Sequence, residues 1–245
     1  MTGDMRTFYE NEAERRKWGE ALAGEGLFPT ELQLVREAFV PGGRVLDVGC
    51  GGGREAFGLA ALGFQVTAVD YLPAFVAACR QGAAARGLSL DVRQADAAEL
   101  PFADGAFDHV MMVGQLLGHV RPRERRRQVL REIGRVMRPG TAIVSTNAIE
   151  RRRWYGAYFW LLNGWRRVYN PLGLEPDDAF VRRIGGEKSA SGERPLFHWY
   201  RTPEFRRDAA AAGWRVERWL RRYEQERALA DPSTSGETFY VLRKE

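Results

Sequence analysis

Short apolar runs alternate with helical stretches through the middle of the chain, beginning at residue 44. Runs of this length, bounded by turn residues, predict buried strands. Strands joined by helices are typical of a parallel sheet with crossover connections. The five runs that predict strands are Arg44–Val48, Gln65–Asp70, Ser89–Gln94, Phe107–Val113 and Thr141–Thr146.

The segments between these runs carry helix signals. A helix fits Arg54–Leu62, and Gly63 can end it. Pro73 can open the next helix, which runs to a stop at Gly87. A third helix over Arg123–Met137 has apolar residues at helical spacing and ends before Pro139-Gly140. These helices complete the predicted crossovers.

The alternation breaks between residues 147 and 201, where aromatic and arginine residues dominate. It resumes with a helix from Thr202 to Ala212 and two further strands, Trp214–Arg221 and Thr238–Leu242. The roughly 40 residues before the first strand have a helical pattern. The chain is therefore expected to contain seven strands, with a long insertion after the fifth.

The sharpest motif runs from Asp47 to Gly53, between the first strand and the first helix. Glycines let the backbone turn tightly and approach a ligand, although glycine turns also serve purely structural purposes. Asp70 ends the second strand, where a carboxylate can accept both ribose hydroxyls. A dinucleotide site shares these features, but an acid beside the loop repels a pyrophosphate and suits a ligand with an ammonium group.

Four motifs in sequence order resemble the class I S-adenosylmethionine-dependent methyltransferases: VLDVGCGGG, VTAVDY, QADAAELPFADGAFDHVMM and GRVMRPGTAIVST. The resemblance covers about residues 40–146. It implies a Rossmann-like α/β fold with a seven-stranded, mostly parallel sheet, helices on both faces and an antiparallel last strand. We expect one domain over 1–245: a helical cover (1–40), a core (41–146 and 202–245) and a helical lid over the acceptor (147–201).

The resemblance also implies a binding site for S-adenosyl-L-methionine, with S-adenosyl-L-homocysteine as product. The glycine loop would surround the methionine part, and Asp70 would hold the ribose. Tyr71 would lie along the adenine, whose amine would meet Asp96, and Ala97 would offer its backbone N–H to the base. The other expected donor contacts are Asp47, Gly49, Cys50, Gly51, Gly53, Gln115, Leu116 and Tyr9, with Cys50 as a packing residue and Tyr9 shielding the methionine end.

Candidate groups for the acceptor come from the loops after the fourth and fifth strands. His119 could act as a base or could pack structurally, and His109, inside a strand, is expected to be structural. His198 and Tyr200 end the insertion and are the favoured acceptor contacts. The aromatic residues of the insertion could pack on the sheet, line a pocket for a flat acceptor, or both.

Charge and composition narrow the function classes. The chain has 37 basic and 32 acidic residues, and only three of the basic residues are lysines. The arginines could reflect a GC-rich genome or could bind phosphate or carboxylate groups. Two distant cysteines suggest neither a disulfide nor a zinc site, and we expect no metal. The first residues lack the apolar core of a secretory signal, so a cytoplasmic location is the simplest expectation.

The sequence therefore predicts methyl transfer to an O, N or C atom of a small-molecule acceptor. An RNA methyltransferase is the first alternative, because of the basic balance and the RPRERRR run at 121–127. A donor-binding protein without catalysis is the second. We expect no membrane partner, and the oligomeric state is not predicted. The arginines at 121–127 and 151–153 have no assigned role.

Overall fold

A computed structural model describes residues 5–21, 24, 26–149, 153–180, 183–184, 187–188, 194–221 and 237–244. Within these residues, seven strands form one sheet, in the order β10-β11-β5-β4-β1-β2-β3. Their bounds are β1 (Arg44–Val48), β2 (Gln65–Asp70), β3 (Asp91–Gln94), β4 (Phe107–Met112), β5 (Met137–Asn147), β10 (Arg215–Arg221) and β11 (Glu237–Lys244).

The strand directions confirm the predicted Rossmann-like sheet. Strands β3, β2, β1, β4 and β5 run parallel to their neighbours. Strand β11 is antiparallel both to β5 and to β10, which flank it. The carboxyl ends of the parallel strands therefore share one edge of the sheet, which is where open α/β sheets bind ligands.

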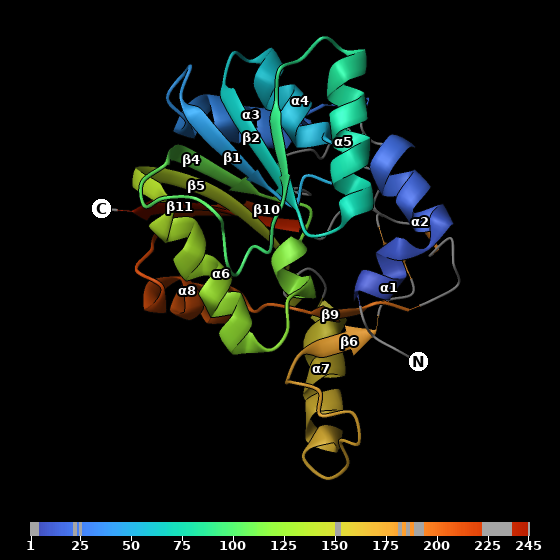
Figure 1. Ribbon diagram of the computed structural model, residues 1–245. Coiled ribbons are helices and arrows are strands. Elements are labelled where there is room, and N and C mark those ends of the chain that lie inside the picture. The colour runs from blue at the N-terminus through green and yellow to red at the C-terminus, as the bar shows by residue number, and fades with distance from the viewer. Residues whose placement is uncertain are drawn as a thin grey trace.

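Helices cover both faces of the sheet (Figure 1). One face packs against α3 (Pro29–Ala38), α4 (Arg54–Ala61) and α5 (Pro73–Ala85). The other packs against α6 (Arg123–Arg135) and α8 (Thr202–Ala211). The apolar residues predicted at helical spacing in α6, among them Val129 and Ile133, are fully buried in that second layer.

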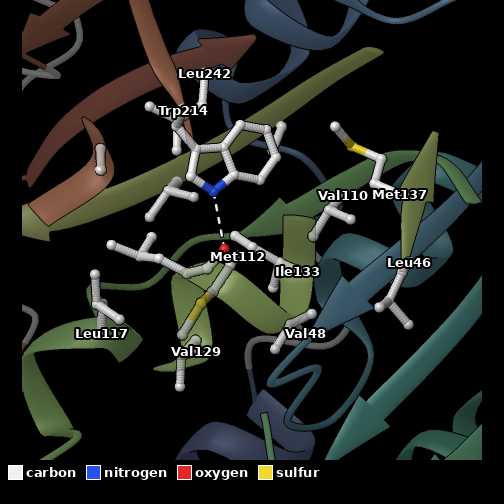
Figure 2. Close-up of a cluster of buried hydrophobic side chains, with 14 of the residues drawn as sticks. Leu46, Val48, Val110, Met112, Leu117, Val129, Ile133, Met137, Trp214 and Leu242 are labelled. Atoms are coloured by element: carbon white, nitrogen blue, oxygen red, sulfur yellow. Dashed lines mark hydrogen bonds between the residues drawn. The ribbon is translucent and has the colours of Figure 1, made fainter. Parts of the chain in front are cut away.

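The core under α6 and α8 is continuous with the apolar residues of the central strands. Figure 2 shows strand residues such as Val48 and Met112 together with Val129 and Ile133 of α6. The Trp214 indole lies among them, and its N–H donates to the Leu130 carbonyl at 2.8 Å. This bond satisfies the one polar atom of a large buried side chain.

The fifth strand departs most from its predicted boundaries. Strand β5 begins at Met137, so Pro139 and Gly140 lie inside a strand rather than in a break before it. The pairing of β4 with β5 is irregular between Phe107 and His109, and this irregularity accommodates a proline that cannot donate to the ladder.

The N-terminal segment and the insertion complete the described structure. Helices α1 (Met5–Glu10) and α2 (Glu12–Arg16) lead into η1 (Lys17–Ala21), a π-helical turn. The insertion contains α7 (Arg153–Arg166) and two small antiparallel sheets, β6 (Asp178–Phe180) with β9 (Leu196–His198) and β7 (Arg183–Ile184) with β8 (Glu187–Lys188). It is therefore not only helical. Arg151 and Arg152 lie outside the described residues.

None of the helices that the structure describes is long and apolar enough to cross a membrane.

Candidate functional site

The glycine loop after β1 is held against the end of β2. The N–H groups of Gly49 and Cys50 both donate to the Val69 carbonyl, at 2.7 and 3.0 Å. Gly49 has a φ of +78°, and a Cβ there would lie 2.2 Å from Cδ1 of Leu116. Glycine is therefore required at this position both by backbone conformation and by space.

Asp47, the last residue but one of β1, is a buried acid beside this loop. Its Oδ2 is buried without a hydrogen-bond partner in the part of the chain that the structure describes. Burial, with a further contribution from the negative Glu55, raises the pKa of Asp47 well above its usual range. A cationic group at this oxygen would compensate the carboxylate, so the position fits the ammonium of an S-adenosylmethionine molecule.

Asp70 lies at the end of β2 and contacts both flanking loops. Its Oδ2 accepts from the Gly51 N–H at 3.0 Å, and its Oδ1 accepts from the Leu72 N–H at 2.9 Å. Burial raises the pKa of Asp70, while these backbone N–H groups act against the rise. Each oxygen can still accept a second hydrogen bond, as a ribose contact requires. The neighbouring Tyr71 ring is 48% exposed.

Asp96 and Ala97 follow β3 at the same edge. Asp96 Oδ1 accepts from the Ala98 N–H at 2.8 Å. Its Oδ2 is paired with the guanidinium of Arg125 on α6. The position of Asp96 in this loop was predicted from the sequence, but its ion pair with Arg125 was not.

The loop after β4 is fixed by two residues that the sequence reasoning did not identify. Glu237 Oε1, on β11, accepts from the Gly114 N–H at 2.9 Å and from the Ser145 hydroxyl. Ser145 Oγ in turn accepts from the Gln115 N–H at 3.1 Å. Gln115 adopts a left-handed φ of +64°, which these bonds hold in place. An isolated acid just before the last apolar strand was the only sequence signal for Glu237.

The N-terminal segment lies over the glycine loop and the start of α5. The Tyr9 ring contacts Phe75, Trp18 and His119, with centroid distances of 5.8, 6.4 and 5.7 Å. Burial raises the pKa of the Tyr9 hydroxyl. The Gly52 N–H donates to the Trp18 carbonyl at 3.2 Å, which ties η1 to the loop.

His119 lies between this cover and the insertion. Its ring centroid is 4.0 Å from that of Phe197 on β9. Burial lowers its pKa to about 3, so the imidazole is neutral at physiological pH. Its Nδ1 is buried and has no hydrogen-bond partner among the described residues. The proposed base role would therefore rest on a weakly basic ring. The contacts that the ring makes are with the aromatic side chains of Tyr9 and Phe197.

His198 and Tyr200, the favoured acceptor contacts, both lie in buried surroundings. The His198 Nδ1 is 3.0 Å from Asp178 Oδ1, and its Nε2 is 3.3 Å from Glu204 Oε1. Tyr200 is fully buried in the main core cluster, with its ring 5.6 Å from the Arg126 guanidinium. Their contact with an acceptor stays a prediction. His109 has the structural role expected of it, since its Nε2 accepts from the Val40 N–H at 2.8 Å.

The arginines of the 121–127 run pair with acids of the same chain. Asp208 on α8 lies 2.8 Å from Arg123 and 2.8 Å from Arg127. Acids of the insertion pair with two more: Arg126 lies 2.9 Å from Glu175, and Arg121 lies 3.3 Å from Asp178. Glu175, Asp178 and His198 have the spacing of a metal site, but guanidinium groups already supply the positive charge there.

Comparison with known proteins shows similarity to methyltransferases. Residues 45–140 match the family model described as a methyltransferase domain. A Mycobacterium tuberculosis protein described as uncharacterized is 38% identical over 129 residues, which is 52% of this chain and 45% of that protein. A ubiquinone biosynthesis O-methyltransferase of Xanthomonas axonopodis pv. citri is 34% identical over 124 residues, 46% of this chain and 52% of the relative.

The fold extends the likeness beyond the matched sequence. A SAM-dependent methyltransferase of Methanosarcina mazei superposes with a TM-score of 0.68 at 18% identity, covering 89% of this chain and 98% of the other. The chain spans about half the length of the curated relatives that it matches.

Proposed function

We propose that this chain, which belongs to the class I S-adenosylmethionine-dependent methyltransferases, moves a methyl group from that donor to an O, N or C atom of a small-molecule acceptor. The observation that carries the proposal is the pair of buried carboxylates that flank the glycine loop, Asp47 and Asp70. Asp47 has a buried oxygen with no hydrogen-bond donor among the residues that the structure describes, and Asp70 is oriented by two backbone N–H groups.

Each expected donor contact has a chemical role in this proposal. Asp47 binds the ammonium, and the loop residues Gly49, Gly51 and Gly53 leave room for the methionine chain. Asp70 accepts the ribose hydroxyls, and Tyr71 lies along the adenine. Asp96 accepts from the adenine amine while it shares its carboxylate with Arg125, and the Ala97 N–H donates to an adenine ring nitrogen. Gln115 and Leu116 lie beside the reacting sulfur.

When bound, the donor supplies an electrophilic methyl group on a sulfonium. The work left to the protein is to position the acceptor in line and to exclude water. The ring cluster of Tyr9, Trp18 and Phe75 is placed to cover the site. His119 is neutral, so it can accept a proton or a hydrogen bond from the acceptor without repelling the sulfonium.

The acceptor is proposed to bind between the core and the insertion, which acts as the lid. His119 already contacts Phe197 of the insertion there, and Phe197 belongs to an apolar cluster with Phe159 and Trp199. The relatives named as ubiquinone biosynthesis O-methyltransferases support transfer to oxygen. The internal pairing of the 121–127 arginines removes the main sequence feature that favoured RNA.

Replacing Asp70 by Asn tests the donor site. Loss of a charged hydrogen-bond acceptor should weaken S-adenosylmethionine binding by about tenfold or more, measured by titration calorimetry. The matched control is Asp91→Asn, which removes an exposed carboxylate one strand away and should leave the affinity unchanged. A Asp70→Asn variant that unfolds at the same temperature as the wild type and binds the donor equally well would refute the assignment.

A further inference from the structure

Helix α7 carries apolar residues on two sides, about 100° apart around its axis. Its inner side, which includes Tyr155, Phe159 and Leu162, packs against β6 and β9 in the third apolar cluster of the molecule. Its outer side places Trp154, Tyr158, Leu161 and Trp165 at spacings of four, three and four residues, which brings them onto one stripe. A helix that is apolar all round is normally buried on all sides.

This outer stripe is exposed. Trp154, Leu161 and Trp165 are 55%, 63% and 64% exposed, and Trp160, on another side of α7, is 74% exposed. Of the eleven exposed large apolar residues in the described part of the chain, eight lie between residues 154 and 172. Figure 1 shows why: α7 projects away from the sheet, beyond the ends of α6 and α8. Exposed apolar patches of this kind mark interaction sites.

The charge of the chain is concentrated in the same segment. Residues 151–174 contain five arginines and no acidic residue. The chain as a whole has 37 basic and 32 acidic residues, so outside this segment 32 basic residues balance 32 acidic ones. The segment that exposes the aromatic stripe thus has a formal charge of +5.

We propose that the outer surface of α7 docks on an anionic lipid bilayer. Tryptophan and tyrosine favour the interface between headgroups and acyl chains, and flanking arginines are attracted to acidic headgroups. With 14 residues, α7 is suited to lie in the plane of the interface rather than to cross it. The basic, acid-free composition of 151–174 is the complement that an anionic surface requires.

The shape of the surface favours lipid over the other possible partners. Single-stranded nucleic acid binds in grooves where bases stack on aromatic rings. Here the helix is convex, and the aliphatic side chains Leu161 and Val168, 63% and 85% exposed, offer nothing for a base to stack on. A second copy of the chain would bring two such segments of like charge together.

Docking there would also place the proposed acceptor site at the membrane surface. The inner side of α7 reaches Phe197 through the same apolar cluster, and Phe197 contacts His119. This last step rests on the proposed function, whereas lipid binding itself requires neither donor nor acceptor.

Vesicle flotation tests the docking surface. The full chain is expected to float with vesicles of phosphatidylglycerol and phosphatidylcholine in equal amounts, and to bind pure phosphatidylcholine vesicles much less. The double variant L161S/W165S should lower the partition coefficient roughly tenfold, since two large apolar contacts are lost. Trp219→Ser, which removes an exposed tryptophan of β10, is the matched control and should bind as the wild type does.

A charge variant keeps the test decisive if the double variant folds poorly. Arg167→Glu should weaken binding by about fivefold or more, while Arg207→Glu on α8 makes the same charge change away from the patch and should have little effect. Donor affinity, measured by calorimetry, should be the same in all four variants. A variant with lower donor affinity would report a change in the donor site and not in the docking surface. The proposal is overturned if anionic vesicles are not bound, or if binding is equal in L161S/W165S. It is also overturned if the wild-type chain does not bind vesicles but self-associates or binds RNA, and L161S/W165S abolishes that binding.

Discussion

At the scale of single residues, the candidate site depends on how each buried ionisable group is compensated. Asp70 is satisfied by two backbone N–H groups, and His109 is held between the Val40 N–H and the Thr141 carbonyl. Asp47 and His119 have buried atoms without such partners among the described residues. Asp70 and His109 fix the backbone around them through these hydrogen bonds, whereas the buried atoms of Asp47 and His119 can be satisfied by a ligand.

His198 gives a prediction for the dependence of stability on pH. Burial lowers the pKa of His198, but its contacts with Asp178 and Glu204 outweigh burial and Arg126, so the pKa is raised above 6.5. Protonation therefore stabilises the folded state. This contribution is complete below pH 6.5 and is lost as the pH rises through the folded-state pKa.

Urea unfolding of His198→Gln should accordingly show a loss of about 3 kcal/mol at mildly acidic pH, and a smaller loss in alkaline buffer. His119→Gln is the contrasting control. Burial lowers its pKa to about 3, so the wild type should lose stability relative to this variant as the pH falls below 6.5. An effect of His198→Gln that does not change with pH would contradict the ionic assignment.

The sequence predicted the positions of residues that belong to short continuous motifs. The glycine loop, Asp70 and Asp96 lie at the strand ends where the motifs placed them. Glu237 was missed because its partner Gly114 is 123 residues away, and no pattern links the two. His198 and Tyr200 lie at the end of the insertion, and their contact with an acceptor stays a prediction. Their ionic neighbours come from other elements, which the sequence could not indicate.

At the scale of elements, the N-terminal cover and the glycine loop are packed without spare room. A Cβ on Gly52 would lie 1.9 Å from the Gly19 carbonyl oxygen of η1. Gly52→Ala should therefore displace the cover while the sheet stays folded. Overpacking costs about 1–3 kcal/mol, so trypsin cleavage at Arg15, Arg16 and Lys17 should rise roughly tenfold.

Gly164→Ala is the control for this variant, because a Cβ on that helical glycine meets nothing within 4 Å. Hydrogen exchange of residues 5–21 should increase in Gly52→Ala and stay unchanged in Gly164→Ala. Equal protection of the cover in both variants would mean that η1 is not held by the loop.

Element boundaries followed the sequence where periodicity was strong. Strands β1 and β2 have the predicted limits, since each is a short apolar run between turn residues. Strands β6 and β9 were not predicted. They have three residues each and pair residues that are 16 to 20 positions apart in the chain, so their formation depends on tertiary contacts rather than on local preference.

At the scale of the whole molecule, α6 is the element that joins the insertion to the core. Arg126 is fully buried, lies 2.9 Å from Glu175 of the insertion and donates to the Val120 carbonyl at 3.1 Å. Arg126→Met should lower the free energy of unfolding by about 3 kcal/mol, because it removes the buried cation beside Glu175.

Arg131→Met provides the comparison, measured by urea unfolding in the same buffer. Arg131 is on the same helix and pairs with the exposed Glu124, so its loss should cost less than about 1 kcal/mol. Similar costs for the two variants would show that the buried contact adds no more than a surface ion pair.

The position of β11 has a consequence for how the chain reaches this structure. Because β11 lies between β5 and β10, both neighbours are synthesised before the strand that joins them. Until residues 237–244 emerge from the ribosome, β5 is an open edge and β10 has no place in the sheet. An open edge invites pairing with other chains. Cotranslational folding should therefore stop at a five-stranded intermediate, and this is the stage at which a nascent chain most needs protection by a chaperone.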